Sequence, residues 1–218
     1  MGRPTSGYKI DGEKVPGVTT IINRFKLSGG LIHWAWQQGM DGKDYRETRD
    51  AAADAGTLAH DMVEADIYGA PFDRTAYKSD VLDKADGAFK AYQEWKRQTQ
   101  LEVAESELSL LSRQHRFGGT LDALFIQGRL ALGDWKTSNA VYADHLLQLA
   151  AYAILWEENY PDRPITGGAH LLRFSKSQHP DDPITFAHHY WSDLTLAKKQ
   201  FLLYREAFDL DKRLSTFI

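Results

Sequence analysis

The spacing of apolar residues predicts that the first hundred residues are mainly helical. Over residues 80–98, apolar side chains recur every three or four positions, which is the period of one face of an α-helix. These side chains belong to Val81, Ala85, Ala88, Phe89, Tyr92 and Trp95. Similar patterns predict helices over residues 18–25, 30–38 and 46–68, and the segment Ser28-Gly29-Gly30 separates the first two.

After residue 100 the pattern changes to short, nearly continuous apolar runs over residues 105–111, 117–126 and 130–136. Such runs predict strands that are covered on both faces of a sheet. The later elements are predicted in this order: a helix over 143–159, strands over 165–174 and 184–190, and a final helix from its N-cap Ser192 to Phe208. Because a hairpin is followed by a crossover helix, we expect an α/β fold with a central mixed sheet flanked by helices.

Two acidic residues interrupt these apolar strands. If the turn between the second and third strands holds residues 127–129, Asp122 lies directly opposite Asp134, with Cβ atoms roughly 5 Å apart. The same face would also carry Leu124, Ile126, Leu130, Leu132 and Lys136. Like charges in this arrangement destabilise a sheet unless a positive charge lies between them. Since carboxylates supply the hard oxygen ligands that divalent cations prefer, the pattern indicates a metal site.

The residues also allow a purely structural interpretation. Asp134 and Lys136 could form a buried ion pair while Asp122 is solvated at a strand end, because buried Asp and Lys residues are almost always paired. In addition, a slip of one residue in the hairpin would place the two Asp residues on opposite faces. The pattern of charges alone leaves these alternatives open.

A larger motif extends beyond the hairpin. Gly118-Gly119-Thr120-Leu121-Asp122 is followed by Asp134-x-Lys136 and then by Gln148-x-x-x-Tyr152. This order resembles the PD-(D/E)xK nuclease superfamily, and more narrowly the exonuclease family typified by the nuclease domain of RecB, to which many phage recombination exonucleases belong. The upstream segment Gly56-Thr57-Leu58-Ala59-His60 resembles the first motif of that family, and Glu107 resembles its acidic residue before the hairpin.

The resemblance runs from about Val15 to Tyr152 and more loosely to the C-terminus. It implies a restriction-endonuclease-like core behind a helical N-terminal region. We therefore expect a single nuclease domain over residues 1–218, in which residues 1–100 are mainly helical and residues 101–218 form the sheet core with the catalytic motifs.

The resemblance also implies a metal shell. Its expected ligands for Mg²⁺ or Mn²⁺ are His60, Asp122, Asp134 and the backbone carbonyl of Trp135. For His60 the alternative is a structural or surface histidine. Glu107 either holds a second metal through water or merely ends a strand. Some members of the family carry an iron–sulphur cluster held by four Cys, but this chain has no Cys and cannot hold such a cluster.

Three further residues complete the implied catalytic set. Lys136 is expected to contact the scissile phosphate or the attacking water. Gln148 and Tyr152 lie four residues apart, on one face of the predicted helix. The resemblance implies that Gln148 holds Lys136 or the DNA strand, and that Tyr152 supports the site or stacks. Elsewhere, adjacent His188 and His189 point to opposite faces of a strand and make a poor chelate, so we interpret them as structural or surface residues.

The formal net charge of −4 is not typical of a nucleic-acid-binding protein. Affinity for DNA would therefore come from a local basic patch together with the metal. The candidate DNA-binding residues are Arg46, Arg49, Arg113, Arg116, Trp34 and Trp36. The alternatives are that the arginines are solvated surface charges and that the tryptophans pack in the core rather than stack on bases.

Composition sets the cellular context. No run approaches the ~20 apolar residues of a membrane span, residues 1–11 lack an apolar signal region, and the absence of Cys favours a cytoplasmic protein. The hypothesis is a metal-dependent exonuclease acting on linear double- or single-stranded DNA in recombination, repair or phage replication, where a phage context implies a single-strand annealing protein as partner. The alternatives are a catalytically silent DNA-binding or scaffold module and a restriction-type endonuclease.

Overall fold

The structure is a computed structural model that describes residues 4, 6–26, 29–100, 102–126, 128–138, 140–174 and 186–217, without the side chains of 52 and 123–125. Its centre is a five-stranded sheet in which the strands follow one another in sequence order. The strands are β3 (Glu102–Ser112), β4 (Phe117–Ile126), β5 (Arg129–Lys136), β6 (Ala169–Phe174) and β7 (Phe186–Trp191). Only the β5–β6 pair is parallel in this described sheet. The predicted mixed α/β fold is confirmed.

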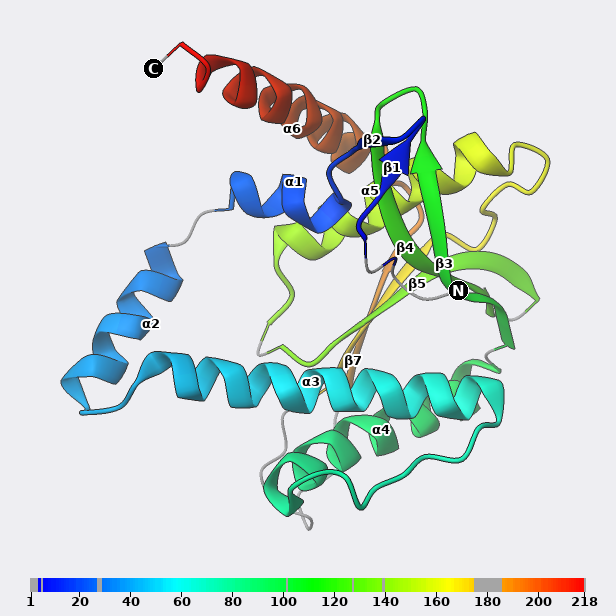
Figure 1. Ribbon diagram of the computed structural model, residues 1–218. Helices are drawn as coiled ribbons and strands as arrows, with labels where there is room; N and C mark the ends of the chain where they lie inside the picture. The colour runs from blue at the N-terminus through cyan, green and yellow to red at the C-terminus, as the bar shows by residue number, and fades with distance from the viewer. Residues whose placement is uncertain are drawn as a thin grey trace.

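Helices cover both faces of this sheet (Figure 1). Those helices are α1 (Val18–Arg24), α3 (Tyr45–Tyr68), α4 (Ser79–Thr99), α5 (Ala143–Asn159) and α6 (Thr195–Leu214), whereas α2 (Gly29–Met40) lies away from the sheet. A short hairpin of β1 (Lys9–Ile10) and β2 (Glu13–Lys14), which the sequence pattern did not reveal, precedes α1. None of the described helices combines the length and the apolar character needed to cross a membrane.

Two apolar cores lie on the two sides of the sheet. On one side α5, backed by α1 and α6, packs on residues such as Leu121, Leu132 and Leu171. On the other side α3 and α4 pack on residues such as Trp135 and Leu172. The predicted burial of the strands on both faces is therefore confirmed, because consecutive residues of β5 and β6 enter opposite cores.

The predicted hairpin register is wrong by one residue. Ile126 pairs with Arg129, so the turn contains two residues, and Asp122 faces Gly133 instead of Asp134. Gly128 has φ +72°, a conformation that favours glycine and allows a strand to reverse within two residues. Gln127, the other turn residue, lies outside the described residues.

This register also changes the faces. Leu130 and Leu132 pack with α5, whereas Ile126 packs with α3 and α4, so the expected common face does not exist. The side chain of Leu124 lies outside the described part of the chain. By strand alternation, Asp122 belongs to the side of Ile126, and Asp134 belongs to the side of Leu132.

Two element boundaries differ from the prediction for local reasons. The final helix begins at Thr195, because Asp193 Oδ1 accepts hydrogen bonds from the Thr195 backbone N–H at 2.8 Å and from its hydroxyl at 2.6 Å. Ser192 is therefore not the N-cap. Strand β6 begins at Ala169 and not at Ile165, since Gly168 has φ +76° and cannot extend the strand backwards. The predicted start of the next strand, residues 184–185, lies outside the described residues.

Candidate active site

The candidate site is built where β4 and β5 separate. Their last paired residues are Asp122 and Gly133. Beyond that point β4 stays paired with β3 as far as Phe117, while β5 stays paired with β6 as far as Lys136. Asp134 and Lys136 therefore lie on the β5 arm just past a fork, and Asp122 lies on the β4 arm where the fork opens.

Glycines on the β4 arm allow other elements to approach its backbone closely. A Cβ atom on Gly119 would lie 2.8 Å from Leu155 Cδ1 and 3.1 Å from Tyr152 Cε1, both on α5. A Cβ atom on Gly118 would lie 2.4 Å from the ring of Tyr8. Only residues without a side chain fit there, so Gly119 allows α5 to pack against the fork and Gly118 makes room for Tyr8.

A β-bulge in β3 holds Asp122. The β3–β4 register shifts between Glu105 and Leu108, and Glu107 in this bulge has φ +50°. The bulge directs the Glu107 backbone N–H to Asp122 Oδ1 at 2.9 Å, and Ser106 Oγ lies 3.0 Å from the same oxygen. Burial, joined by the charges of Glu107 and Asp134, raises the pKa of Asp122 to about 7 despite these two hydrogen bonds.

The side chain of Glu107 belongs to an acidic group between β3 and α3. Burial and the charges of Glu64 and Asp61 raise the pKa of the Glu107 carboxyl. Burial likewise raises the pKa of Asp61, although His60 opposes the effect. Because like charges disfavour ionisation of their neighbours, this side of the fork favours the approach of a cation.

Asp134 and Lys136 form the ion pair that the structural interpretation expected. Asp134 is only 9% exposed, and Lys136 Nζ lies 3.0 Å from its Oδ1 and 2.8 Å from its Oδ2. The Oδ2 contact lacks hydrogen-bond geometry, and that buried oxygen accepts no hydrogen bond from the described residues. The other half of the interpretation fails, because Asp122 is partly buried and hydrogen-bonded instead of solvated.

His60 on α3 faces the β5 arm. Burial lowers the pKa of His60, with Lys136 adding to the effect, while Asp134 and a hydrogen bond to the Trp135 backbone raise it. A backbone group that raises an imidazole pKa must accept its proton, so His60 donates to the Trp135 carbonyl. One helical turn earlier, a Cβ on Gly56 would lie 2.9 Å from Thr137 Oγ1, which shows how closely α3 packs against the end of β5.

Gln148 and Tyr152 interact along α5, as their spacing predicts. Gln148 Nε2 donates to Tyr152 Oη at 2.6 Å. Tyr152 is 7% exposed, and burial and the charge of Asp134 raise the pKa of its hydroxyl. A ring so enclosed has no free face for a base. Tyr152 therefore lies beside Asp134 in a position suited to supporting the site.

Two residues near the site were not assigned a role from the sequence. His145 lies one turn before Gln148, and burial together with the charge of Lys136 lowers its pKa; its three-residue spacing from Gln148 was the available signal. Ser106, which donates to Asp122, had no signal, because its position depends on the bulge in β3.

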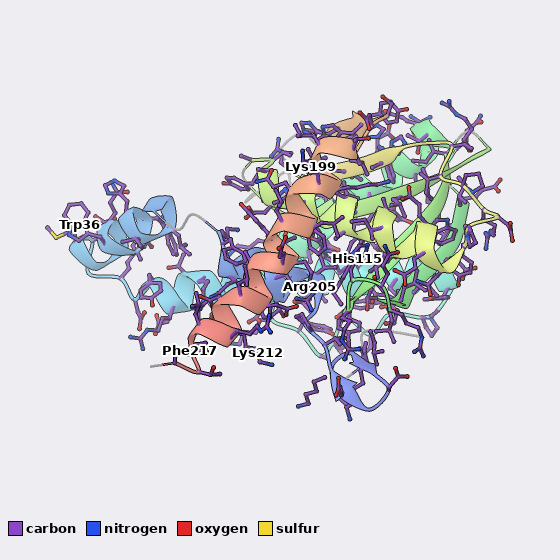
Figure 2. All side chains as sticks on the ribbon, turned by 90° about the horizontal axis from the view of Figure 1, so that it is seen from above. Trp36, His115, Lys199, Arg205, Lys212 and Phe217 are labelled. Atoms are coloured by element: carbon purple, nitrogen blue, oxygen red, sulfur yellow. The ribbon has the colours of Figure 1, made fainter. Side chains whose placement is uncertain are left out.

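The candidate DNA-binding residues fall into two separate groups. On α2 and α3, Trp36 is 59% exposed, Trp34 packs edge-on against Tyr45, and the guanidinium groups of Arg46 and Arg49 lie 5.8 Å and 6.0 Å from the Tyr45 ring. At the β3–β4 turn, the two remaining arginines form ion pairs with the N-terminal hairpin: Arg113 with Asp11 and Arg116 with Glu13. Figure 2 shows the separation, with Trp36 at the far side of the molecule from His115 of that turn.

The donor types at the fork fit a hard divalent cation, although the expected ligands are not gathered into a finished shell. In the described residues, no three His, Asp or Glu side chains lie close enough together to hold a metal ion. Asp134 Oδ2 is buried without a hydrogen bond, and the pKa of Asp122 is raised, so both carboxylates would gain from a cation. The Trp135 carbonyl accepts one hydrogen bond from His60 and keeps a second lone pair for a cation.

Comparison with known proteins adds a sequence match across nearly the whole chain. The model of the PD-(D/E)XK nuclease superfamily matches residues 14–213, a range that includes every site residue from Trp34 to Tyr152. No curated protein sequence matches the chain. Two solved structures resemble it at 14% identity. "Crystal structure of SSO0001" has a TM-score of 0.32 and covers 61% of this chain and 62% of that chain. "Crystal Structure of LHK-Exo in complex with dAMP" has a TM-score of 0.34 and covers 77% of this chain and 92% of that chain. The chain thus spans less than two thirds of the first of these proteins.

Proposed function

The chain belongs to the PD-(D/E)XK nuclease superfamily, and from that premise we propose that it is a Mg²⁺- or Mn²⁺-dependent deoxyribonuclease that degrades DNA from its ends. The single observation that carries the proposal is the fork between β4 and β5. It brings one carboxylate from each arm, Asp122 and Asp134, to the same opening, with Lys136 directly beside Asp134.

Phosphodiester hydrolysis needs a positioned water, stabilisation of negative charge and a proton for the leaving group. Asp122 and Asp134 would hold the cation, which when bound polarises the phosphoryl oxygen and lowers the pKa of its water. Lys136, already oriented by Asp134, would place its positive charge at the phosphate and stabilise the charge that develops there. A site without catalysis has no chemical need for all three residues, which argues against a silent DNA-binding module.

The other site residues would complete this arrangement. His60 is held neutral by burial; while one ring N–H donates to the Trp135 carbonyl, its other ring nitrogen would bind the cation. The Trp135 carbonyl would be the fourth ligand. Glu107 fixes Asp122 through its backbone N–H, and its side chain would hold a second cation through water. Tyr152 and Gln148 would keep the wall of α5 beside Asp134 and Lys136 in place.

End dependence rests on the helical region before the sheet. An exposed Trp36 with Arg46 and Arg49 nearby in the chain can stack on bases and neutralise phosphates without reading sequence. A restriction-type endonuclease would instead need side chains that read base edges in a groove, and no such segment is apparent. Arg113 and Arg116 would contribute a second phosphate contact only if DNA displaces their partners Asp11 and Glu13.

We further propose that the chain acts as a single domain in recombination, repair or phage replication, alongside a single-strand annealing protein. The experiment for end dependence uses covalently closed circular duplex, linear duplex and linear single strands of equal length, each with Mg²⁺, Mn²⁺ or EDTA. We expect loss of linear DNA with either metal and intact circles. Rapid nicking of the circles would show that the protein is an endonuclease and not an exonuclease. Binding without cleavage would favour a catalytically silent DNA-binding module.

A further inference from the structure

The segment before α1 occupies the space that β5 leaves beside β4 beyond the fork. The Gly118 N–H donates to the Pro16 carbonyl at 3.1 Å, and Gly17 forms an isolated parallel bridge with Gly118. The β1–β2 hairpin, which leads into this segment, lies beside β3 and β4 in Figure 1. Residues that precede α1 therefore form part of the wall of the fork on the β4 side.

Tyr8 connects this segment with the candidate active site. Its ring lies so close to Gly118 and Gly17 that Cβ atoms on these glycines would lie 2.4 Å and 3.0 Å from it. Its hydroxyl lies 2.9 Å from Thr120 Oγ1. Thr120 precedes Asp122 by two residues, so both side chains leave the same face of β4, roughly 7 Å apart along the strand. Tyr8 thus lies on the same side of β4 as the Asp122 carboxylate.

The Tyr8 ring also lines a pocket of about 520 Å³, here called the N-terminal pocket. Its other lining residues are Pro4, Gly7, Val15, Pro16, Gly17 and Thr20. The ring, the prolines and the valine are apolar, while the Thr20 hydroxyl and the peptide groups of the two glycines can form hydrogen bonds. This size and this mixture are typical of sites for small organic molecules. A flat base joined to a sugar presents matching surfaces.

The hairpin beside this pocket carries two positive charges that no other described residue neutralises. Lys9 and Lys14 are exposed and lie directly opposite each other in the β1–β2 pairing, and neither forms an ion pair within the described part of the chain. The hairpin's acids, Asp11 and Glu13, are already paired with arginines. By strand alternation the lysines lie on the other face from Tyr8, so they act on the pocket through their field, within the Debye length of about 10 Å. The field favours a ligand with negative charge.

We propose that the N-terminal pocket receives the nucleoside next to the scissile phosphate of a DNA strand, with its base stacked on the Tyr8 ring. The inference rests on the nuclease function proposed above, which places the scissile phosphate at Asp122. One nucleotide of an extended strand can reach from that carboxylate to the Tyr8 ring, and the next phosphates enter the field of Lys9 and Lys14. Stacking on an aromatic ring accepts every base, as an enzyme that degrades DNA from its ends must do.

The first test uses nuclear magnetic resonance of the ¹⁵N-labelled full chain in EDTA, where binding is measured without cleavage. The probes are a single-stranded thymidine trinucleotide, thymidine and inorganic phosphate. We expect the trinucleotide to shift the amide signals of Gly7, Tyr8 and Gly17 with a dissociation constant on the order of 1 mM, and thymidine to shift the same signals more weakly. Phosphate should leave them unchanged. No shift with the trinucleotide, or equal shifts with phosphate alone, would overturn the proposal.

The second test uses variants in steady-state hydrolysis of linear DNA with Mg²⁺. Tyr8→Ala removes the stacking ring and should raise KM about tenfold with little change in kcat, whereas Tyr8→Phe keeps the ring and should retain most of the affinity. Thr20→Phe starts from an exposed residue of α1 and fills the pocket without removing Tyr8, so it should raise KM even if Tyr8→Ala fails to fold. Tyr77→Ala, at a tyrosine that is 39% exposed outside the pocket, is the control and should match the wild type.

The two tests separate this inference from the proposed function. A wild-type KM in Thr20→Phe would overturn the pocket. Intact cleavage without shifts of the pocket amides would overturn the pocket alone. Shifts of those amides without cleavage by the wild type in any metal would instead overturn the nuclease function, and with it the assignment of the bound nucleoside to the scissile phosphate.

Discussion

Asp134 acts on Asp122 across the fork between β4 and β5, because the two residues are not partners in the β4–β5 pairing. Asp122 pairs with Gly133, and Asp134 follows on the arm that stays with β6. The charge of Asp134 nevertheless contributes to the raised pKa of Asp122. The two acids thus lie within electrostatic reach of each other where the sheet opens, although strand alternation sends them to opposite faces.

Removal of the positive charge at Lys136 should abolish most of the cleavage. Lys136→Met keeps the apolar stem but cannot stabilise negative charge on the phosphate, so we expect kcat to fall by about 10²–10³-fold with a smaller change in KM. The measurement is steady-state hydrolysis of linear DNA in Mg²⁺. The matched variant Lys90→Met changes an exposed lysine on α4 and should retain activity. An equal loss of activity in both variants would show that the effect comes from the overall charge of the protein and not from Lys136 itself.

The close approach of α5 to β4 makes Gly119 intolerant of a side chain. Gly119→Ala places a Cβ 2.8 Å from Leu155 Cδ1, and such overpacking should lower the free energy of unfolding by about 1–3 kcal/mol. Gly39→Ala on α2 meets nothing within 4 Å and should stabilise by up to about 1 kcal/mol through helix propensity. Urea denaturation compares the two. A Gly119→Ala protein as stable as wild type would show that α5 is not seated on the glycine.

How much the sequence could predict is clearest at the hairpin. The apolar runs and the Asp-x-Lys motif correctly located β4 and β5, because burial on both faces leaves a strong pattern. The segment Gln127-Gly128-Arg129 permits turns of two or three residues, so the register could not be chosen from it. The bulge at Glu107 depends on the pairing of β3 with β4. The spatial pattern of the candidate ligands depends on both this bulge and the hairpin register. Local sequence therefore located the strands that carry the candidate residues but not the geometry of those residues.

His60 should contribute to metal affinity through the ring nitrogen that does not donate to the Trp135 carbonyl. His60→Ala frees that carbonyl but removes an imidazole ligand, so we expect Mn²⁺ affinity to fall by about 10-fold and Mg²⁺ affinity to fall less, since imidazole prefers the later metal. Titration of Mn²⁺ followed by electron paramagnetic resonance measures the dissociation constant. An unchanged constant would identify His60 as a structural histidine that orients β5.

Acid should destabilise the protein through a histidine pair outside the site. His170 is 6% exposed, its Nε2 donates to the Gly167 carbonyl at 2.9 Å, and its Nδ1 therefore accepts from His188 Nε2 at 2.8 Å. Burial, with the charges of His188 and Arg129, lowers the pKa of His170 to about 4, although the bond to Gly167 opposes this. His188 thus has a structural role. The sequence had predicted a structural or a surface residue at this position.

The sign of the pH effect follows from linkage. The unfolded histidine binds its proton near pH 6.5 and the folded one only near pH 4, so stability is present above pH 6.5 and is lost as pH falls towards 4. The shift sets an upper limit of about 3 kcal/mol on this loss. Urea midpoints between pH 7.5 and 4.5 should show a shallower slope for His170→Gln than for wild type and for the control His33→Gln, whose residue is exposed on α2. Parallel slopes in all three would contradict the prediction.

The central claim is that Asp122 and Asp134 at the fork hold the cation that drives cleavage. The most direct test measures release of acid-soluble nucleotides from linear DNA by wild type, Asp122→Asn, Asp134→Asn and the exposed-residue control Asp83→Asn, each in Mg²⁺ and in EDTA. We predict activity only for wild type and Asp83→Asn, only with Mg²⁺, and a loss of at least about 100-fold in the two fork variants, which remain folded. Full cleavage in EDTA, or an active Asp134→Asn enzyme, would contradict the claim.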